Sequence, residues 1–329
     1  MTDTIDDKPY VRPDVAGFLG FLNNVPGPKM HELPPPAARQ AYLAMKDIAD
    51  QPVGELAVNK DLVIPGPAGD IPARLFDAKA SREPGPAVVF FHGGGFVIGD
   101  IESHSPFCAE MARVLDLPVI SVDYRLAPEH RWPAAPDDCE AAARWVATSP
   151  EALDRSITSL ILCGDSAGGT LTIVAAMDLR DKPAAVPVIV QAPIYPAADT
   201  SKIYPSYEQF AEGFLLTRAS MDWFNDSYQA DVAHMRGSPM AGGLAGLPPA
   251  VIVTASLDPI RDQGRAYAAA LIAQGIAVTF REATGNIHGF ISLPKAVPSS
   301  AGDIAGYLAA LKTMIAEAEG QRVMAQAAR

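Results

Sequence analysis

The sequence predicts an α/β protein with a mostly parallel sheet of eight strands and helices on both faces. Short runs of apolar and β-branched residues alternate with stretches of helical periodicity along most of the 329 residues. From residue 87 onward these runs are almost continuously hydrophobic, which is typical of strands buried on both faces. With 49% hydrophobic and 19% charged residues, the chain has enough apolar material for a large core and is not a disordered protein.

The first two strands are expected to form an antiparallel hairpin. They occupy residues 56–64 and 71–76, and the segment between them, 65–70, contains two prolines and two glycines, which favour a turn. The other six strands are expected in buried positions, at residues 87–91, 119–124, 159–163, 186–192, 250–255 and 276–281.

Helical patterns separate the later strands. They are expected at residues 104–115, 136–147, 167–179, 263–274 and 301–319. Because a strand, a helix and a parallel strand are joined by a right-handed crossover, this alternation predicts a doubly covered sheet.

Two segments interrupt this alternation. Residues 1–48 contain proline-rich stretches around amphipathic pieces at 15–22 and 37–48, and residues 201–236 are unusually aromatic. The aromatic residues of the second segment are Tyr204, Tyr207, Phe210, Phe214, Trp223, Phe224 and Tyr228. We expect both segments to form a helical cap on a catalytic domain of residues 49–329, with 201–236 inserted into that domain.

Charge and hydropathy restrict the partners and the location. The net charge of −12 repels phosphate backbones and anionic lipids, so nucleic acid and stable membrane association are not expected. The acidic start of the chain lacks the apolar stretch of a signal peptide, and the longest apolar run, 184–198, is interrupted by Pro187, Gln191, Pro193 and Pro196. These features predict a cytoplasmic protein.

The three cysteines, Cys108, Cys139 and Cys163, predict neither a disulfide framework nor a zinc site. Their number is odd and no pair has the CxxC spacing, so each is expected to be a small buried residue. No other cluster has the spacing of metal ligands, and we expect no metal and no cofactor.

The segment Gly-Asp-Ser-Ala-Gly-Gly at residues 164–169 predicts a nucleophilic serine. It joins an expected strand to an expected helix, and G-x-S-x-G at such a junction forms a sharp turn that exposes the serine hydroxyl. Ser166 is therefore the candidate nucleophile. The alternative, a turn that only starts a helix, is weaker because both flanking elements are expected.

A serine nucleophile needs a base and a carboxylate that orients the base. Of the six histidines only His234 and His288 follow Ser166, and His288 comes directly after the last expected strand, whereas His234 lies in the aromatic insert. Asp258 follows the preceding strand and is the candidate carboxylate. Asp262 remains an alternative, although an acid near a helix start is ordinary.

The segment His-Gly-Gly-Gly at residues 92–95 follows the third expected strand and is a candidate oxyanion loop. Consecutive glycines let backbone N–H groups face a substrate without side chains in the way. The N–H of Ala167, next to the nucleophile, is expected to complete the set of donors. Neither this segment nor residues 164–169 matches the glycine patterns of phosphate-binding loops.

Taken together, these motifs resemble those of the bacterial hormone-sensitive-lipase-like esterases, in the branch with the GDSAGG motif. The resemblance rests on HGGG at 92–95, DYRLAPEH at 123–130, GDSAGG at 164–169, DPIRD at 258–262 and HGF at 288–290, and it spans roughly residues 55–320. It implies the α/β-hydrolase fold with a helical cap. The departures are Phe96, Thr170 and Ile260, where tryptophan, asparagine and leucine are frequent.

The resemblance also implies roles for individual residues. Ser166, Asp258 and His288 would form the catalytic triad. The N–H groups of Gly94, Gly95 and Ala167 would form the oxyanion hole, with Gly93 beside them. His92 and residues 124–130 would hold the oxyanion loop in place.

The function expected from this site is hydrolysis of carboxylic esters with short to medium acyl chains, without a cofactor. An amidase, deacetylase or lactonase with the same triad is an alternative, and a non-catalytic receptor on the same fold is a less favoured one. Candidate pocket residues are Phe96, Phe21, Asp165, Phe214 and Trp223. The last strand is expected at the sheet edge, where it offers unpaired backbone groups to a second copy in a homodimer.

Overall fold

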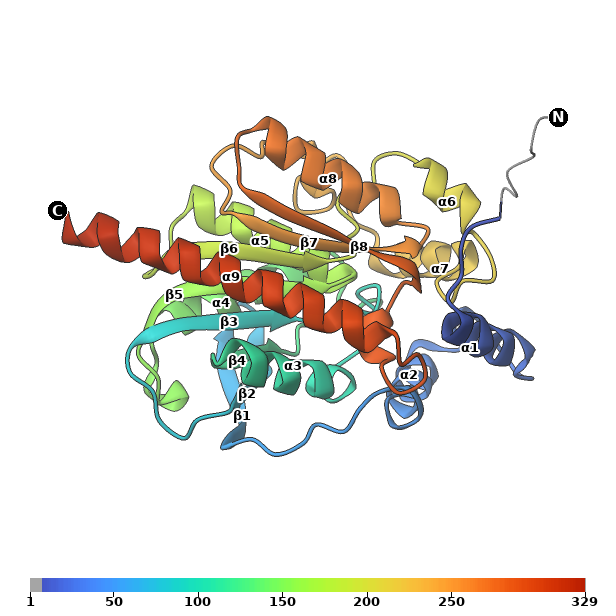
Figure 1. The fold of residues 1–329 in the computed structure, drawn as a ribbon, viewed down its shortest axis with the longest axis horizontal. Helices are drawn as coiled ribbons and strands as arrows, with labels where there is room; N and C mark the ends of the chain where they lie inside the picture. The colour runs from blue at the N-terminus through green and yellow to red at the C-terminus, as the bar shows by residue number, and fades with distance from the viewer. Residues whose placement is uncertain (1–7, 329) are drawn as a thin grey trace.

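The computed structural model describes residues 8–328, which fold around one eight-stranded sheet with the strand order β1-β2-β4-β3-β5-β6-β7-β8 (Figure 1). Strand β2 runs antiparallel to β1 and β4, and all other neighbours are parallel. The strands are β1 (Val58–Gly66), β2 (Gly69–Asp77), β3 (Gly85–Phe91), β4 (Val119–Val122), β5 (Ile157–Asp165), β6 (Val188–Ile194), β7 (Ala250–Leu257) and β8 (Val278–Ile287).

Helices cover both faces of the sheet. On one face α3 (Ile101–Leu115) and α9 (Ser300–Ala327) pack against apolar side chains of the strands. On the other face lie α4 (Ala134–Ala147), α5 (Ala167–Asp181) and α8 (Arg261–Ala273). This arrangement is the α/β-hydrolase fold, and the fold class predicted from the sequence is confirmed.

All eight expected strands are present, and the differences lie at their ends. The strand expected at 276–281 continues as β8 to Ile287, past an irregularity in its pairing with β7. The last residues of β8 are buried, whereas its first residues are not. This burial holds the extension against the core. The final helix also extends beyond the expected 301–319, to Ala327.

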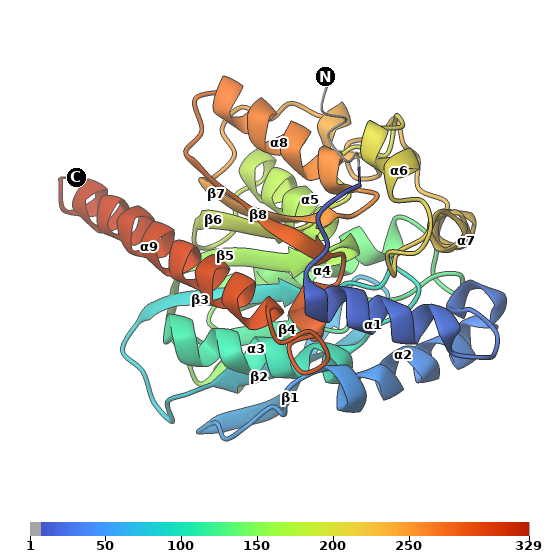
Figure 2. The ribbon, with the colours of Figure 1, turned by 45° about the vertical axis from the view of Figure 1, so that its right-hand side comes forward.

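Four further helices gather at the carboxyl ends of the parallel strands (Figures 1 and 2). They are α1 (Pro13–Asn24), α2 (Pro35–Ala49), α6 (Pro205–Gln209) and α7 (Arg218–Tyr228). A small apolar cluster joins Val15 and Leu19 of α1 to Phe210 and to Leu257 and Ile287 at the strand ends. The segments expected to form a cap therefore lie over the edge at which Ser166 stands. Residues 1–7 of the first segment lie outside the described residues.

The remaining regular elements are single 3₁₀ turns. They are η1 (Met30–Glu32), η2 (Glu151–Leu153), η3 (Pro239–Ala241) and η4 (Phe290–Ser292). The three cysteines are buried and free, as expected. Within residues 8–328, no helix combines the length and the apolar character needed to cross a membrane.

Candidate active site

Ser166 occupies the sharp turn between β5 and α5. Its backbone has φ 54° and ψ −116°, a conformation that L-residues rarely adopt and that is associated with functional sites. The glycines on either side make this turn possible. A Cβ at Gly168 would collide with the carbonyl oxygen of Phe91, and one at Gly164 with that of Gly168. The turn leaves the Ser166 side chain partly exposed at the carboxyl end of the sheet.

Ser166, His288 and Asp258 form one hydrogen-bonded chain. Nε2 of His288 lies 2.8 Å from Oγ of Ser166, and Nδ1 lies 2.7 Å from Oδ2 of Asp258. Asp258 is fully buried directly after β7, and its other oxygen accepts a hydrogen bond of 2.9 Å from the N–H of Ile260. These contacts fix the carboxylate, which in turn orients the imidazole with Nε2 toward the serine.

The two alternative residues lie elsewhere. Asp262 accepts hydrogen bonds from the N–H of Ser206 and from the side chains of Arg261 and Arg265, so it anchors α6. Burial acts to raise the pKa of Asp262, but the hydrogen bond and charge of Arg261 outweigh burial and hold the pKa below the usual value. His234 accepts the N–H of Arg236 in the insert and has no contact with Ser166.

The residues expected to form the oxyanion hole differ in what their backbone N–H groups bind. The N–H of Ala167 is at the first position of α5, where the helix dipole favours negative charge. Among residues 8–328, no acceptor takes a hydrogen bond from the N–H of Gly94, Gly95 or Ala167. The N–H of Gly93 differs, because it donates to Oδ1 of Asp165 at 2.7 Å. Gly93 therefore holds the loop and does not offer a donor to a substrate.

The start of the oxyanion loop is held by a stack of two rings. The rings of His92 and Tyr124 lie 4.3 Å apart and nearly parallel, and the Tyr124 hydroxyl donates to the carbonyl oxygen of His92 at 2.7 Å. Burial, followed by repulsion from His104, lowers the pKa of His92 to about 4. His92 is thus a neutral support of the loop.

The far end of the loop is held from α2. Arg39 donates to the carbonyl oxygens of Val97 and Ala127 at 2.8 and 3.0 Å, and it binds both carboxylate oxygens of Glu129. Glu129 and Ala127 belong to the 123–130 motif identified in the sequence. The N-terminal segment, the oxyanion loop and this motif are therefore tied together at one point.

The candidate pocket residues occupy different positions. Phe96 is half-buried and stacks on Tyr228, whereas Phe214 packs edge-on against Phe210 in the apolar cluster under α1. Trp223 is half-buried beside Phe224. Phe21 is 64% exposed on α1.

Asp165 is buried behind the oxyanion loop. Its carboxylate binds Gly93 and lies 3.3 Å from Nε2 of His104, so it faces the protein interior and not the space above Ser166.

Four residues around the site are not among the candidate site residues predicted from the sequence. Phe224 lies against Gly95 so closely that a Cβ at that glycine would collide with its ring. Leu215, at a φ of 72°, lies next to Gly289, the residue after His288. The other two are Tyr195, whose ring centroid is 4.5 Å from that of His288, and His104. The positive φ of a bulky residue such as Leu215 cannot be predicted from the sequence. His104 is predicted from the sequence only as the first residue of a helix.

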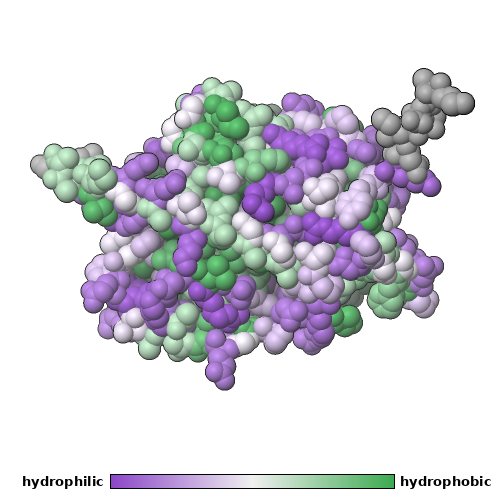
Figure 3. Space-filling view, in the orientation of Figure 1, coloured by the Kyte–Doolittle hydropathy of each residue, from purple (hydrophilic) through white to green (hydrophobic). Residues whose placement is uncertain are grey.

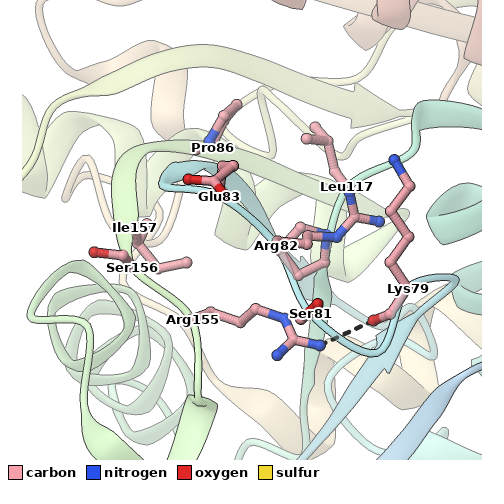
Figure 4. Close-up of a pocket in the computed structure, with 11 residues that line it drawn as sticks. Lys79, Ser81, Arg82, Glu83, Pro86, Leu117, Arg155, Ser156 and Ile157 are labelled. Atoms are coloured by element: carbon pink, nitrogen blue, oxygen red, sulfur yellow. Dashed lines mark hydrogen bonds between the residues drawn. The ribbon is translucent and has the colours of Figure 1, made fainter.

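A cavity of ≈ 490 Å³ lies at the opposite edge of the sheet (Figure 4). It is lined by the segments that lead into β3 and β5, and the length of β5 separates it from Ser166 by about 30 Å at ~3.3 Å per residue. Its cationic side chains are engaged, since Arg82 and Arg155 both bind the buried Asp77, and Arg155 also donates to the carbonyl oxygen of Lys79. The cavity offers neither a nucleophile with a base nor a free cation, and we assign it no part in the chemistry.

Within residues 8–328, no three His, Cys, Asp or Glu side chains are grouped closely enough to hold a metal ion. The arrangement at Ser166 combines a hydroxyl, an imidazole, a buried carboxylate and backbone N–H groups without acceptors, and such a set of groups can perform acyl transfer.

Comparison with known proteins agrees with this chemistry. A family model described as "alpha/beta hydrolase fold" matches residues 88–292. The chain is 36% identical to esterase LipI of Mycobacterium tuberculosis over 91% of its length and 94% of that protein. It is 33% identical to an ethyl acetate hydrolase of Pseudomonas putida, over 86% of this chain and 92% of that one.

Solved structures are similar over nearly the whole chain. An α/β-hydrolase enzyme from the metagenome of Lake Arreo, 35% identical, superimposes with a TM-score of 0.87 over 94% of this chain and 98% of its own. An ester-hydrolase from the same metagenome, solved with a bipyridine phosphonate derivative, is 36% identical with a TM-score of 0.85, over 93% and 99% of the two chains. The chain therefore belongs to the α/β-hydrolase family, in the branch of hormone-sensitive-lipase-like carboxylic ester hydrolases.

Proposed function

We propose that this protein hydrolyses carboxylic esters of short to medium acyl length through a Ser166–His288–Asp258 triad and an acyl-enzyme intermediate. The observation that carries the proposal is the continuous hydrogen-bonded chain from Ser166 Oγ through both ring nitrogens of His288 to Asp258. A serine whose only role was to begin α5 would not need a histidine on its hydroxyl and a buried carboxylate, that of Asp258, on the other side of that histidine.

In the first half of the reaction His288 acts as a base. Nε2 removes the Ser166 proton while Oγ attacks the ester carbonyl carbon, and the imidazolium that forms is stabilised by Asp258 through Nδ1–H. The N–H groups of Gly94, Gly95 and Ala167 bind the negative oxygen of the tetrahedral intermediate. Nε2–H then protonates the alcohol, which leaves, and the acyl group stays on Oγ.

In the second half water replaces the alcohol. His288 removes a proton from the water as it attacks the acyl-enzyme, the same N–H groups bind the second oxyanion, and Oγ leaves with the proton held by Nε2. The acid is released and Ser166 is restored. No step needs a metal or an organic cofactor.

The substrate range follows from the residues above the triad. Phe224 lies against Gly95 and Leu215 beside Gly289, so apolar side chains from the 201–236 segment contact the glycine loop and the residue after His288. We propose that this segment and residues 1–48 act as a cap over the site and limit the acyl chain to short or medium length.

A panel of esters tests the proposal. Aryl and alkyl esters with acyl chains of two to sixteen carbons are assayed beside matching amides and lactones, with the wild-type protein and with Ser166→Ala. We expect turnover of the shorter esters by the wild type and a loss of about 10⁴-fold or more in the variant. Faster turnover of the amides or lactones would replace esters as the substrate class, and substantial hydrolysis by Ser166→Ala would contradict the triad.

A further inference from the structure

A buried ion pair stands directly behind the oxyanion loop. Asp165 precedes the nucleophile in the chain, and its Oδ1 both accepts the N–H of Gly93 at 2.7 Å and lies 3.3 Å from Nε2 of His104. Asp165 is 4% exposed and His104 is fully buried on α3. Neither residue is part of the proton path through His288.

Asp165 distinguishes the first amide of the glycine loop from the next two. Its carboxylate accepts the N–H of Gly93, whereas the N–H groups of Gly94 and Gly95 have no acceptor among the described residues. A charged acceptor makes this hydrogen bond stronger than a neutral one would. The contact therefore holds the start of the loop that carries the Gly94 and Gly95 amides.

The negative charge of Asp165 would by itself oppose binding of an oxyanion by the loop. An unpaired negative charge behind the loop would repel the oxyanion that the loop has to bind, and the low dielectric of the interior would strengthen that repulsion. A positive charge at His104 cancels it, since the imidazole is in ion-pair distance of Asp165. A pair of opposite charges can thus hold the loop without opposing the reaction.

The surroundings of His104 support a charged ring. Burial acts to lower the pKa of His104, but attraction to Asp165 outweighs burial and raises the pKa above 6.5. Burial likewise acts to raise the pKa of Asp165, and attraction to His104 together with the Gly93 hydrogen bond holds the pKa below 3.8.

Other groups also face this pair. Nδ1 of His104 lies 3.0 Å from the Ser103 hydroxyl, and Asp100, at the start of α3, adds negative charge. The rings of Tyr42 from α2 and of His92 lie 6.2 and 5.6 Å away. Burial raises the pKa of Asp50, at the end of α2, and attraction to His104 acts in the opposite direction. Negative groups on two elements thus surround the imidazole.

We propose that His104 is a positioning residue for the oxyanion hole, which as an imidazolium neutralises Asp165 and so lets Asp165 hold Gly93 while the Gly94 and Gly95 amides bind the oxyanion. This inference rests on the proposed function. It differs from a purely structural role because it depends on the charge balance of two residues and not on the space that His104 fills.

Charge balance is tested with a pair of substitutions and their combination. His104→Gln keeps a polar side chain but leaves the charge of Asp165 without a counter-charge, although the Gly93 N–H and the Tyr195 hydroxyl still donate to it. We expect kcat to fall about 10- to 100-fold with little change in KM, less than the 10²–10³ of a lost oxyanion donor. Asp165→Asn keeps an oxygen that can accept the Gly93 N–H and carries no charge. The double variant is therefore expected to recover at least tenfold in kcat over His104→Gln. His234→Gln, the same change in the insert, is the control and is expected to leave kcat unchanged.

The charge itself is measured without catalysis. In Ser166→Ala protein labelled with ¹⁵N, His104 is expected to titrate above the ordinary imidazole value, with both ring nitrogens protonated at pH 6, and the titration is expected to move to lower pH in Ser166→Ala/Asp165→Asn. A His104 that is already neutral at pH 6, or a double variant as slow as His104→Gln or slower, would overturn the positioning role. Failure of the wild type to hydrolyse esters would instead overturn the proposed function, while the ¹⁵N result would still decide the state of the pair.

Discussion

Phe96 and Tyr228 stack face to face with their ring centroids 3.8 Å apart and their planes within 5°. Phe96 directly follows the candidate oxyanion loop of residues 92–95 and has a φ of 63°, whereas Tyr228 is the last residue of α7 in the insert. The stack therefore joins the insert to the end of the loop that is proposed to bind the oxyanion. Phe96, a candidate pocket residue in the sequence, thus forms a contact between the glycine loop and the insert.

Substitutions of Tyr228 separate this contact from other roles. Tyr228→Ala removes the stacked ring, and we expect the free energy of unfolding to fall by about 3 kcal/mol and kcat/KM to fall with it. Tyr228→Phe is the matched control. It keeps the ring and removes a buried hydroxyl that has no hydrogen-bond partner among the described residues, so stability and activity are expected to stay at or above wild-type levels. Equal damage from both variants would contradict the stacking role.

The choice between the two carboxylates of the 258–262 motif can be decided by kinetics. Asp258→Asn removes the charge next to Nδ1 of His288, and we expect kcat to fall about 10⁴-fold because the imidazole is then held in the wrong tautomer. Asp262→Asn weakens contacts to Arg261 and Arg265 and is expected to lower the melting temperature with a much smaller effect on kcat. The reverse order of severity in kcat would assign the orienting role to Asp262.

The fold could be predicted from the sequence because buried strands appear there as short, nearly continuous hydrophobic runs. Hydrophobic runs such as 87–91 and 250–255 correspond to β3 and β7 with only small differences at the ends. The positions of Ser166, Asp258 and His288 after their strands were likewise predictable, because the carboxyl ends of parallel strands meet at one edge of a sheet. Strand ends were less predictable, since the last residues of β8 owe their pairing to tertiary contacts.

The surroundings of the triad could not be predicted in the same way. Leu215 and Phe224 reach the site only through the path of the insert, and nothing in their local sequence distinguishes them from Phe214 or Trp223. Asp165, one of the pocket candidates predicted from the sequence, is the residue before Ser166 in the chain. Adjacent residues at a tight turn point in different directions, and the Asp165 side chain turns inward to Gly93.

The pH dependence of stability can be traced to a buried acid. Asp50 is 4% exposed, and burial raises its pKa to about 6, against an ordinary value of 3.8. The folded state then binds the proton more tightly than the unfolded state, so this group lowers stability progressively as pH rises from about 4 to 6, and the full effect is present above 6. We expect Asp50→Asn to raise the melting temperature at pH 8, by an amount worth about 1–3 kcal/mol, and to have no such effect at pH 4. A benefit that is equal at both pH values would show that ionisation is not the cause.

Strand β8 forms one edge of the sheet, as expected, and its outer backbone groups have no neighbouring strand within the described residues. Phe280 on this strand is 38% exposed and Ile272 on α8 is 58% exposed. We predict that two copies pair along β8 about a two-fold axis. Light scattering is expected to give twice the 34.7 kDa mass of the chain at micromolar concentration, and Phe280→Lys is expected to shift the protein to monomer.

A second exposed apolar surface provides a control for that experiment. The free end of α9 projects from the body and shows hydrophobic surface (Figure 3), where Val323 and Met324 are 50% and 73% exposed. Met324→Lys changes this surface and leaves β8 intact, so the dimer is expected to persist. A monomeric wild-type protein would rule out pairing through β8, and loss of the dimer in Met324→Lys alone would move the interface to α9.

The last prediction concerns acyl length and separates residues that limit the substrate from residues that hold the cap together. Phe224 lies against Gly95, which is proposed to donate to the oxyanion, so in that proposal its ring stands next to the ester carbonyl. Phe214 packs edge-on against Phe210, with ring centroids 5.2 Å apart, in the cluster beneath α1. We therefore expect Phe224→Ala to move the kcat/KM optimum to longer acyl chains, because each further buried CH₂ contributes about 0.8 kcal/mol where space allows. Phe214→Ala is expected to lower the melting temperature and leave the optimum in place.

Trp223 provides the comparison within α7. It neighbours Phe224, whose ring atoms are the nearest to a Cβ placed at Gly95, so Trp223→Ala is expected to shift the optimum less than Phe224→Ala does. The measurement is kcat/KM across p-nitrophenyl esters of two to sixteen carbons, with melting temperatures for each variant. A wild-type protein that hydrolyses long-chain triglyceride emulsions efficiently would contradict a closed apolar site, because such substrates need an open groove. An unchanged profile in Phe224→Ala, in a protein that still melts cooperatively, would show that this ring does not limit the acyl chain.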